Sequence, residues 1–244
     1  MEKVYLSVII PAYNEEKRIS DTLLDIDHYL SEQSYSYEIL VVNDGSKDKT
    51  ASVVKKFAGL IKNLRLIDNQ ENHGKGYVTR QGMLEAKGEY LIYLDADNAI
   101  SLDQIEGFWP YLKDYDIIIG SIEVKGAKIE EQAAWYRRVL GKWSKYLIRA
   151  LTVWEIHDSQ RAFKLFPAEI AEEVFSRQTL ERWGFDFEIL TIAKKSGYRI
   201  KELPVTWINP GGGTLTLMAY FRTLKELLKV KWNLIRGKYD QKKN

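Results

Sequence analysis

The sequence predicts an α/β fold in which a mostly parallel sheet is covered by helices on both faces. Short, continuous apolar runs rich in β-branched residues recur through the first half of the chain. Segments with apolar residues three and four positions apart alternate with these runs. Strands that are apolar on both faces belong to a sheet buried on both sides, and alternation with helices is typical of parallel crossovers.

The elements of the first half follow in regular order. The first strand, YLSVII at Tyr5 to Ile10, ends at Pro11, and apolar residues at helical spacing follow from Ile19 to Leu30. Further strands are predicted at YEILVVND (37–44), LRLID (64–68), EYLIYLD (89–95) and YDIIIGS (115–121). Further helices are predicted at 46–61, 77–86 and 102–112, and the loop NQENHGKG (69–76) precedes the second of these.

The second half is less regular. Helices are predicted at 132–154, at 181–197 after a turn, and from about Leu215 to Ile235. Strands are predicted at SQRAFKLF (159–166) and at RIKELPVTW (199–207), which Pro204 interrupts; NPGGG (209–213) is predicted as a loop and 236–244 as a polar tail. Because no long linker divides the chain, we expect one catalytic domain over 1–210 and a C-terminal amphipathic helix with its tail over 211–244.

The composition restricts the class of function. The 244 residues carry a formal net charge of only +2, so nucleic acid is not an expected partner. The absence of cysteine excludes disulfides, zinc–thiolate sites and a cysteine nucleophile, and it fits a reducing compartment. The N-terminal apolar run is too short for a signal peptide, and no run approaches the ~20 apolar residues of a membrane span. We therefore expect a protein that is soluble or lies on a membrane surface.

Polar and glycine residues follow four predicted strands. The strands lead into PAYNEE, NDGSKDKT, NHGKG and DADN. Ligands of such sheets bind at the carboxyl ends of the strands, so these segments are expected along one edge. Asp44 can accept hydrogen bonds from a base or ribose, Gly74 and Gly76 allow close backbone approach, and Lys75 can offset phosphate charge.

The DAD segment offers two carboxylates, Asp95 and Asp97, directly after a buried strand. Mg²⁺ typically takes one or two carboxylates together with substrate phosphates and water, so the pair is interpreted as the site of a metal–diphosphate. A D-x-D segment also occurs in ordinary surface loops, and Asn14-Glu15 could simply cap the first helix. HGKG lacks the spacing of a Walker loop, and no G-x-G-x-x-G follows a strand.

The motifs in combination are more specific than each alone. VIIPAYNEEKRI, VVNDGSKDKT, NHGKGYVTRQGMLEAKGEYLIYLDADNA and GFDFEIL occur in this order. Together they resemble family 2 glycosyltransferases of the GT-A (Rossmann-like) fold. DSQRAFKLF and RWGFDFEIL further resemble two motifs of the dolichyl-phosphate (polyprenyl-phosphate) glucose and mannose synthases. The resemblance covers about Val4 to Trp207.

The resemblance implies roles for individual residues. The nucleotide-sugar site would comprise Pro11, Ala12, Tyr13, Asn14, Glu15, Asp44, Gly74, Lys75, Gly76, Asp95, Ala96 and Asp97. Asp95 and Asp97 would hold Mg²⁺ or Mn²⁺, and they and Arg161 would be catalytic. The acceptor phosphate would meet Ser121, Gln160, Arg161, Lys164 and Asp186. An acceptor that is already anionic needs little help from a general base, so catalysis would rest on positioning and leaving-group stabilisation, with inversion at the sugar.

Three segments depart from the synthase motifs. Ile122 replaces the arginine of a "GSR" segment, Arg161-Ala162 replaces Cys-Gly, and Ala99 stands where mannose synthases often have glutamine. The last change favours the glucose subgroup. The lost arginine bears on phosphate recognition, and we hypothesise that Arg161 supplies the missing charge.

Two predicted helices, Trp135 to Trp154 and Leu217 to Ile235, pair an apolar stripe with basic residues. Ordinary packing on the core would produce such a pattern, but Trp, Tyr and basic side chains also suit a bilayer interface. A lipid-phosphate acceptor favours the second interpretation, with the protein peripheral at the cytoplasmic face of a membrane.

The predicted function is transfer of a hexose, glucose from UDP-glucose by preference, to dolichyl or polyprenyl phosphate. Transfer from GDP-mannose and transfer to a saccharide acceptor stay open as alternatives. A nucleotide-sugar-binding protein without catalysis is the alternative from another class, suggested by Ile122 and Arg161.

Overall fold

The computed structural model describes residues 3–129, 135–208 and 217–240, of which 135–142 and 217–220 are described by their backbone alone. The centre of the molecule is a seven-stranded sheet with the order β3-β2-β1-β4-β7-β5-β8. Its strands are β1 (Leu6–Ala12), β2 (Tyr37–Asp44), β3 (Leu64–Asn69), β4 (Tyr90–Tyr93), β5 (Ile117–Ser121), β7 (Lys164–Pro167) and β8 (Ile200–Pro204). All neighbours pair in parallel except β7, which is antiparallel to both β4 and β5. The expectation of a mostly parallel sheet is confirmed.

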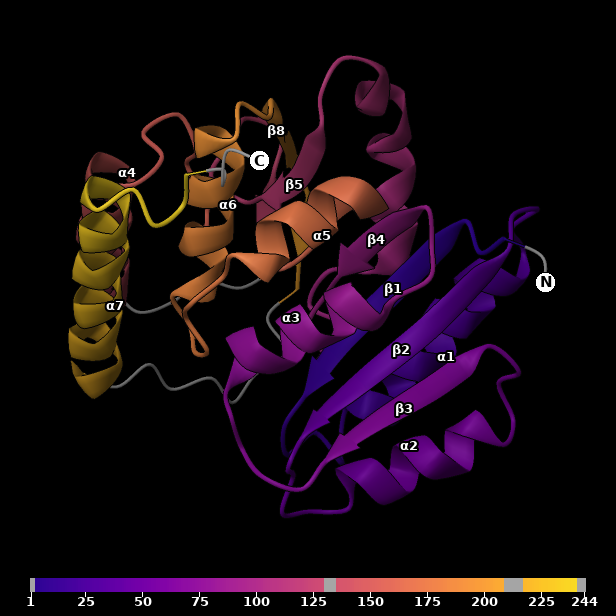
Figure 1. Cartoon of the computed structure of the whole chain (residues 1–244). Coiled ribbons are helices and arrows are strands. Elements are labelled where there is room, and N and C mark those ends of the chain that lie inside the picture. Colours follow the sequence, from indigo (N-terminus) through magenta and orange to yellow (C-terminus); the bar gives the residue numbers. More distant parts are fainter. Residues whose placement is uncertain (1–2, 130–134, 209–216, 241–244) are drawn as a thin grey trace.

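Helices cover both faces of this sheet (Figure 1). They are α1 (Ile19–Ser31), α2 (Thr50–Ala58), α3 (Lys75–Glu85), α4 (Trp135–Leu151), α5 (Ala168–Ser176), α6 (Phe185–Lys195) and α7 (Leu217–Ile235). Two short 3₁₀ helices, η1 (Leu102–Gly107) and η2 (Trp109–Lys113), stand where one α-helix was expected at 102–112. Pro110 cannot donate a backbone hydrogen bond, so a regular helix cannot continue through it.

Alternate residues of the strands fill two separate cores. Ile9, Leu40 and Val42 pack with side chains of α3, α5 and α6 on one face. Val8 and Ile10 pack with side chains of α1 and α2 on the other. Successive side chains of a strand point to opposite faces, so a run that is apolar throughout serves both cores at once.

Two strands of the second half differ from the sequence-based prediction. The predicted strand at 159–166 begins only at Lys164, because Phe163 adopts a positive φ of 75° and turns the chain just before it. The predicted strand at 199–207 is divided after Pro204 into β8 and β9 (Thr206–Trp207), and β9 pairs with β6 (Lys128–Ile129) in a small second sheet. The predicted loop at 209–213 and the last residues of the predicted tail, 241–244, lie outside the described residues.

Helices α4 and α7 lie side by side at one end of the molecule (Figure 1). Ile148 of α4 and Leu227 and Val230 of α7 are buried in the core. Other large apolar side chains of the pair are exposed: Trp143, Tyr146, Leu147, Phe221, Leu224, Leu228, Trp232 and Ile235. Among the described helices, none combines the length and the apolar character that crossing a membrane requires.

Candidate active site

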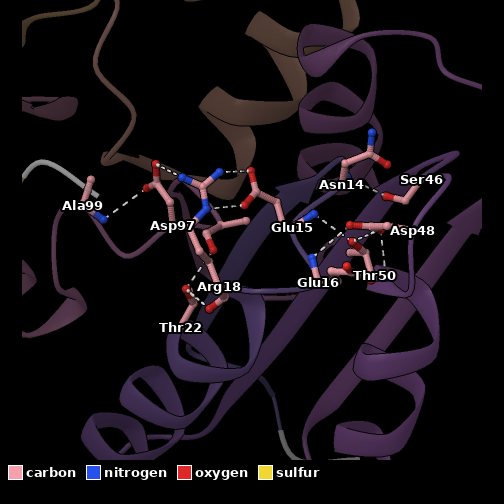
Figure 2. A network of polar contacts seen from close by, with 11 residues as sticks. Asn14, Glu15, Glu16, Arg18, Thr22, Ser46, Asp48, Thr50, Asp97 and Ala99 are labelled. Carbon is pink, nitrogen blue, oxygen red and sulfur yellow. Dashed lines mark hydrogen bonds and ion pairs between the residues drawn. The ribbon is translucent and has the colours of Figure 1, made fainter. Parts of the chain in front are cut away.

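The loops that follow β1 and β2 hold each other in place (Figure 2). Asn14 has a positive φ of 57°, its backbone N–H donates to Ser46 Oγ at 3.0 Å, and its Oδ1 accepts from Lys47 N at 2.8 Å. The Asp48 carboxylate accepts from Glu16 N at 3.2 Å. Asn14 and Glu15 therefore do not cap α1, whose N-cap residue is Arg18 and has no side-chain cap bond. The capping alternative is wrong, because the Asn14 side chain is used to join the two loops.

Asp44 organises the third loop. Its carboxylate accepts from His73 N at 2.7 Å, from Gly74 N at 2.9 Å and from the Asn72 side chain at 2.8 Å. Burial raises the pKa of Asp44, and these backbone bonds oppose the shift. The contact predicted between Asp44 and a base or ribose stays a prediction, and the structure adds that this carboxylate shapes the turn that leads to Lys75.

The two glycines of this loop are close to the segment before α6. A side chain at Gly74 would come within 2.5 Å of Glu181 O, and one at Gly76 within 2.8 Å of Arg182 O. Gly74 also has a φ of 109°, which side-chain-bearing residues rarely adopt. The sequence predicted close backbone approach to a ligand here. The neighbour that the structure shows is the protein's own segment from Leu180 to Arg182.

Asp95 and Lys75 form a direct ion pair at the end of β4. Burial would disfavour both charges, but the nearby Lys75 ammonium outweighs it and lowers the pKa of Asp95. In the same way Asp95 and Asp186 together outweigh burial and raise the pKa of Lys75. The Lys75 ammonium also lies 5.4 Å from the centre of the Trp183 ring. The sequence placed Lys75 near the nucleotide, and the structure joins it to a predicted metal ligand.

Asp97 has weaker partners. Its Oδ1 accepts from Ala99 N at 3.2 Å, and its Oδ2 lies 3.9 Å from Arg18 Nη1 (Figure 2). Arg18 itself is held by two bonds to Glu15, at 2.7 and 2.9 Å. Burial, followed by the negative charge of Asp95, raises the pKa of Asp97. The positive charges of Arg18 and Lys75 only partly oppose this shift.

The chain's own residues fit a divalent cation at this place. The side chains of Asp95 and Asp97 are 35% and 22% exposed, so a ligand can reach both. Within residues 3–129, 135–208 and 217–240, no group of three or more His, Cys, Asp or Glu forms a metal cage. Two carboxylates are what Mg²⁺ requires when substrate phosphates and water complete its shell. Thr22 supports the segment by donating from Oγ1 to Ala96 O at 2.8 Å.

Arg161 and Ile122, which belong to two of the three departures from the synthase motifs, meet at one carboxylate. Arg161 Nε lies 3.5 Å from Asp158 Oδ2, and the same oxygen accepts from Ile122 N at 3.2 Å. The Arg161 guanidinium also lies 4.9 Å from the centre of the Trp207 ring. A narrow cavity links this group to the metal-site segment; its lining is Leu94, Asp95, Ala99, Ile100, Arg161, Ala162, Phe163 and Trp207.

The residues predicted at the acceptor phosphate differ in accessibility. Gln160 and Arg161 are partly exposed, whereas Ser121 and Lys164 are fully buried and Asp186 nearly so. Ser121 Oγ accepts from Glu123 N at 3.1 Å. In this conformation the buried side chains have no open path to an acceptor, and their predicted role stays a prediction.

Lys164, Asp186 and Tyr93 form a buried polar cluster. Asp186 Oδ1 accepts from Lys164 Nζ and from Tyr93 Oη, both at 2.6 Å. Burial, followed by Asp186, raises the pKa of Tyr93, so the phenol keeps the proton that it donates. Burial also lowers the pKa of Lys164, although Asp186 lies beside it. The Asp186 carboxylate also raises the pKa of Lys75. Because Asp186 lies in the first turn of α6, its two hydrogen bonds hold the start of this helix against β4 and β7.

Sequence reasoning missed three residues of the site: Arg18, Tyr93 and Trp183. A tyrosine in the otherwise apolar run of β4 was the signal for Tyr93, because a buried phenol needs a hydrogen-bond partner. Arg18 and Trp183 lie within the motifs VIIPAYNEEKRI and RWGFDFEIL, but neither residue was assigned a role. Of the predicted nucleotide-site residues, Pro11 and Ala12 are buried in β1, and Tyr13 is 43% exposed at its end.

The family model described as "Glycosyl transferase family 2" matches residues 7–175, which include the strand ends that carry Asn14, Asp44, Asp95 and Asp97. The chain belongs to glycosyl transferase family 2. This family 2 glycosyltransferase is 36% identical over 235 residues to a dolichyl-phosphate beta-glucosyltransferase of Trichomonas vaginalis, covering 93% of the chain and 73% of that protein. It is 33% identical over 248 residues to the dolichyl-phosphate beta-glucosyltransferase of Homo sapiens, covering 95% of the chain and 76% of that protein.

Solved structures of glycosyltransferases share the fold of this family 2 enzyme. The mannosyl-3-phosphoglycerate synthase from Rubrobacter xylanophilus aligns with a TM-score of 0.69 and 14% identity, covering 99% of the chain and 77% of that structure. The glucosyl-3-phosphoglycerate synthase from Mycobacterium tuberculosis, in complex with Mn²⁺, UDP and glucosyl-3-phosphoglycerate, aligns with a TM-score of 0.66 and 14% identity, covering 94% and 80%. At these identities the likeness concerns the fold alone, and it confirms the GT-A prediction.

Proposed function

We propose that this glycosyltransferase moves glucose from UDP-glucose to dolichyl or another polyprenyl phosphate at a membrane surface. The acceptor and the sugar are inferred from the dolichyl-phosphate beta-glucosyltransferases to which the chain is similar over more than nine-tenths of its length. The observation that carries the chemistry is the pair Asp95 and Asp97 at the end of β4, where Asp95 pairs closely with Lys75 and Asp97 makes only a longer contact, 3.9 Å, with Arg18.

On the donor side, the joined loops after β1 and β2 form the wall of the proposed nucleotide site. Asn14, Asp44 and Asp48 are already fixed by bonds to backbone N–H groups, so little ordering is required when a nucleotide binds. Lys75 reaches the end of β4 from the start of α3 and can turn from Asp95 to a diphosphate oxygen.

Asp95 and Asp97 would hold Mg²⁺ or Mn²⁺. Such an ion, when bound, offsets the negative charge that develops on the departing diphosphate. One oxygen of the lipid phosphate attacks the anomeric carbon, a bond forms between them, the bond from that carbon to the UDP oxygen breaks, and UDP leaves. The acceptor is ionised beforehand, so no general base is required, and a single displacement inverts the anomeric configuration. Arg161, held against Asp158 and Trp207, is the proposed contact for the acceptor phosphate.

Membrane contact is proposed for the face formed by α4 and α7. Its exposed aromatic and aliphatic side chains, among them Trp143 and Phe221, are accompanied by basic residues such as Arg149 and Arg222. Aromatic rings and long basic side chains suit the boundary between lipid headgroups and acyl chains. This arrangement would place the enzyme at the cytoplasmic face of a membrane, where a lipid phosphate presents its headgroup.

The direct test is a transfer assay with a panel of donors. The protein is incubated with Mg²⁺ or Mn²⁺, radiolabelled UDP-glucose, UDP-N-acetylglucosamine or GDP-mannose, and polyprenyl phosphate in detergent. We expect label from UDP-glucose in the organic phase and none when the metal is chelated. Label from GDP-mannose alone would show that the donor is GDP-mannose and not UDP-glucose. Label only on a water-soluble saccharide would contradict the lipid acceptor.

A further inference from the structure

A groove runs between α7 and the segment that precedes α6. Its volume is about 760 Å³, and it is lined by Thr179, Leu180, Glu181, Arg182, Trp183, Arg222, Thr223, Lys225, Glu226, Lys229 and Trp232. Trp183, beside Lys75, is the residue that this groove shares with the active site described above. The two tryptophans are 61% and 56% exposed, so the groove presents two large aromatic rings to a ligand.

The groove is connected to the active site through Trp183. The Lys75 ammonium lies 5.4 Å from the centre of the Trp183 ring, and the same ammonium pairs with Asp95. Tyr77 N donates to Glu181 O at 3.0 Å, which fixes the segment before α6 to the start of α3. One end of a ligand that fills the groove would therefore lie beside the Lys75 ammonium, which pairs with Asp95 of the proposed metal site.

The charge of the groove is positive. Four lining side chains are basic, namely Arg182, Arg222, Lys225 and Lys229, and two are acidic, Glu181 and Glu226. Glu226 is already used, because its Oε2 accepts from Gly184 N at 2.8 Å, and burial raises the pKa of this carboxyl. Glu181 is then the one acidic lining residue set against the four basic side chains, so the groove favours an anionic ligand.

The direction of the groove follows from α7. Glu226 touches Gly184, the residue after Trp183, so this turn of α7 faces the active-site end. Arg222, Lys225 and Lys229 lie within four residues of Glu226 on the helix. Trp232 lies six residues beyond Glu226, or about 9 Å along the axis at 1.5 Å per residue. Arg222 and Lys225 thus lie near the Trp183 end, Lys229 lies midway, and the Trp232 ring lies further away, with the Arg236 guanidinium 5.2 Å from its centre.

We propose that this groove binds the polyprenyl phosphate acceptor, with its phosphate at the Trp183 end and its first isoprenoid units against Trp232. The inference rests on the proposed function and names the path by which the acceptor approaches Lys75 and Asp95. Charge complementarity selects an anionic headgroup, and the exposed rings select an apolar chain attached to it. Continuity with Lys75 favours the reacting lipid over a bulk phospholipid, which has no need to reach the active site.

Binding can be measured without catalysis. The protein in detergent-free buffer, without donor, metal or vesicles, is titrated with farnesyl phosphate, a short soluble polyprenyl phosphate, and tryptophan fluorescence is followed. We expect saturable binding, and a rise in Kd of at least about tenfold in Trp232→Ala and in the double variant Arg222→Gln/Lys229→Gln, a factor of ten being 1.4 kcal/mol. Tyr111→Ala and Lys238→Gln, an exposed aromatic residue and an exposed basic residue outside the groove, are the matched controls and should change Kd less than twofold.

The same variants separate the groove from the proposed function. With long-chain polyprenyl phosphate and UDP-glucose, the groove variants should raise the KM for the lipid about tenfold and leave the KM for UDP-glucose within twofold. If farnesyl phosphate binds as expected but no sugar is transferred, the proposed function fails and the groove assignment stands. If transfer occurs and the groove variants match the wild type in both Kd and KM, the groove assignment is overturned.

A comparison of two lipids provides a further test that could contradict the proposal. Dihexanoyl-phosphatidylglycerol, a soluble phospholipid with one negative charge, should bind at least tenfold more weakly than farnesyl phosphate. Equal binding of the two would overturn the proposal, because the groove would then be a general site for anionic lipids. The substituted side chains are exposed, and circular dichroism will verify that each variant is folded.

Discussion

Two regions of the molecule differ in how their side chains are accommodated: the loops after β1 and β2, and the face formed by α4 and α7. In the loops, Asn14, Asp44 and Asp48 each accept backbone N–H bonds, so the polar groups of the donor side are paired within the protein. On the helical face, Trp143 and Phe221 remain 70% and 68% exposed.

The difference indicates two kinds of ligand. A preformed polar pocket loses little entropy when it binds a water-soluble nucleotide, because its loops are already ordered. Exposed apolar side chains gain free energy only when something apolar covers them. We infer that the donor side is built to bind from solution and that the α4–α7 side is built to meet a lipid surface. Four experiments test this difference between the two regions.

The largest effect is expected from Asp97→Ala. This carboxylate makes only a long ion pair with Arg18, at 3.9 Å, so its oxygens can exchange this partner for a metal ion. Loss of a metal's charge stabilisation removes several kcal/mol from the transition state, so turnover should fall by about a thousandfold or more. Turnover with Mg²⁺ and Mn²⁺ is the measurement, and Asp103→Ala, which removes an exposed carboxylate on η1, should retain activity. Near-normal turnover in Asp97→Ala would contradict the metal assignment.

Lys75→Met should lower kcat/KM for the donor by about tenfold to a hundredfold, since a hydrogen bond to a charged group contributes about 1.5–3 kcal/mol. The same change should tighten Mn²⁺ binding, measured by electron paramagnetic resonance, because Asp95 loses the ammonium that neutralises it. Lys55→Met, which breaks the Lys–Asp pair at Asp68, is the control and should change neither quantity. Weaker Mn²⁺ binding in Lys75→Met would show that Lys75 supports the metal site instead of competing for Asp95.

Arg161→Ala should raise the KM for the lipid phosphate about tenfold, the effect of losing one charge-assisted hydrogen bond. Because Ile122 and Arg161 meet at Asp158, adding Ile122→Arg to this variant should restore part of the loss. Steady-state kinetics with varied acceptor give the answer. Arg199→Ala, which breaks an exposed pair with Asp116, should have no effect. An unchanged acceptor KM in Arg161→Ala would leave this arginine with a structural role only.

The smallest effect is expected in membrane flotation. The protein should float with anionic liposomes at low salt and less at high salt, since basic residues near such a surface gain ~1 kcal/mol each and are screened beyond ~8 Å at physiological ionic strength. Trp143→Ser together with Phe221→Ser should reduce the floating fraction, and Leu60→Ser, equally exposed elsewhere, should not. Failure of the wild type to float would mean that the α4–α7 face meets another partner.

Much of the fold could be predicted because its information is local. The continuous apolar runs of β1, β2 and β5 and the helical spacing from Ile19 to Leu30 appear in the sequence within single elements. The position of Asp95 and Asp97 after a buried strand was equally local, and it indicated the active edge of the sheet. Helix α5 and the antiparallel direction of β7 were not predicted, because strand direction depends on which neighbour a segment meets.

The fold class, the family and the sheet edge that bears the polar residues could all be inferred from the sequence. Which charges meet depends on the folded chain: Lys75 pairs with Asp95, Lys164 with Asp186, and Arg161 with Asp158 near Ile122. Tyr93 and Asp186 lie 93 positions apart in the chain, yet their side chains share a hydrogen bond of 2.6 Å. No periodicity encodes such a pair, because it forms only when distant segments pack, and the buried Asp186 carboxylate is then stabilised by the Tyr93 hydroxyl and the Lys164 ammonium.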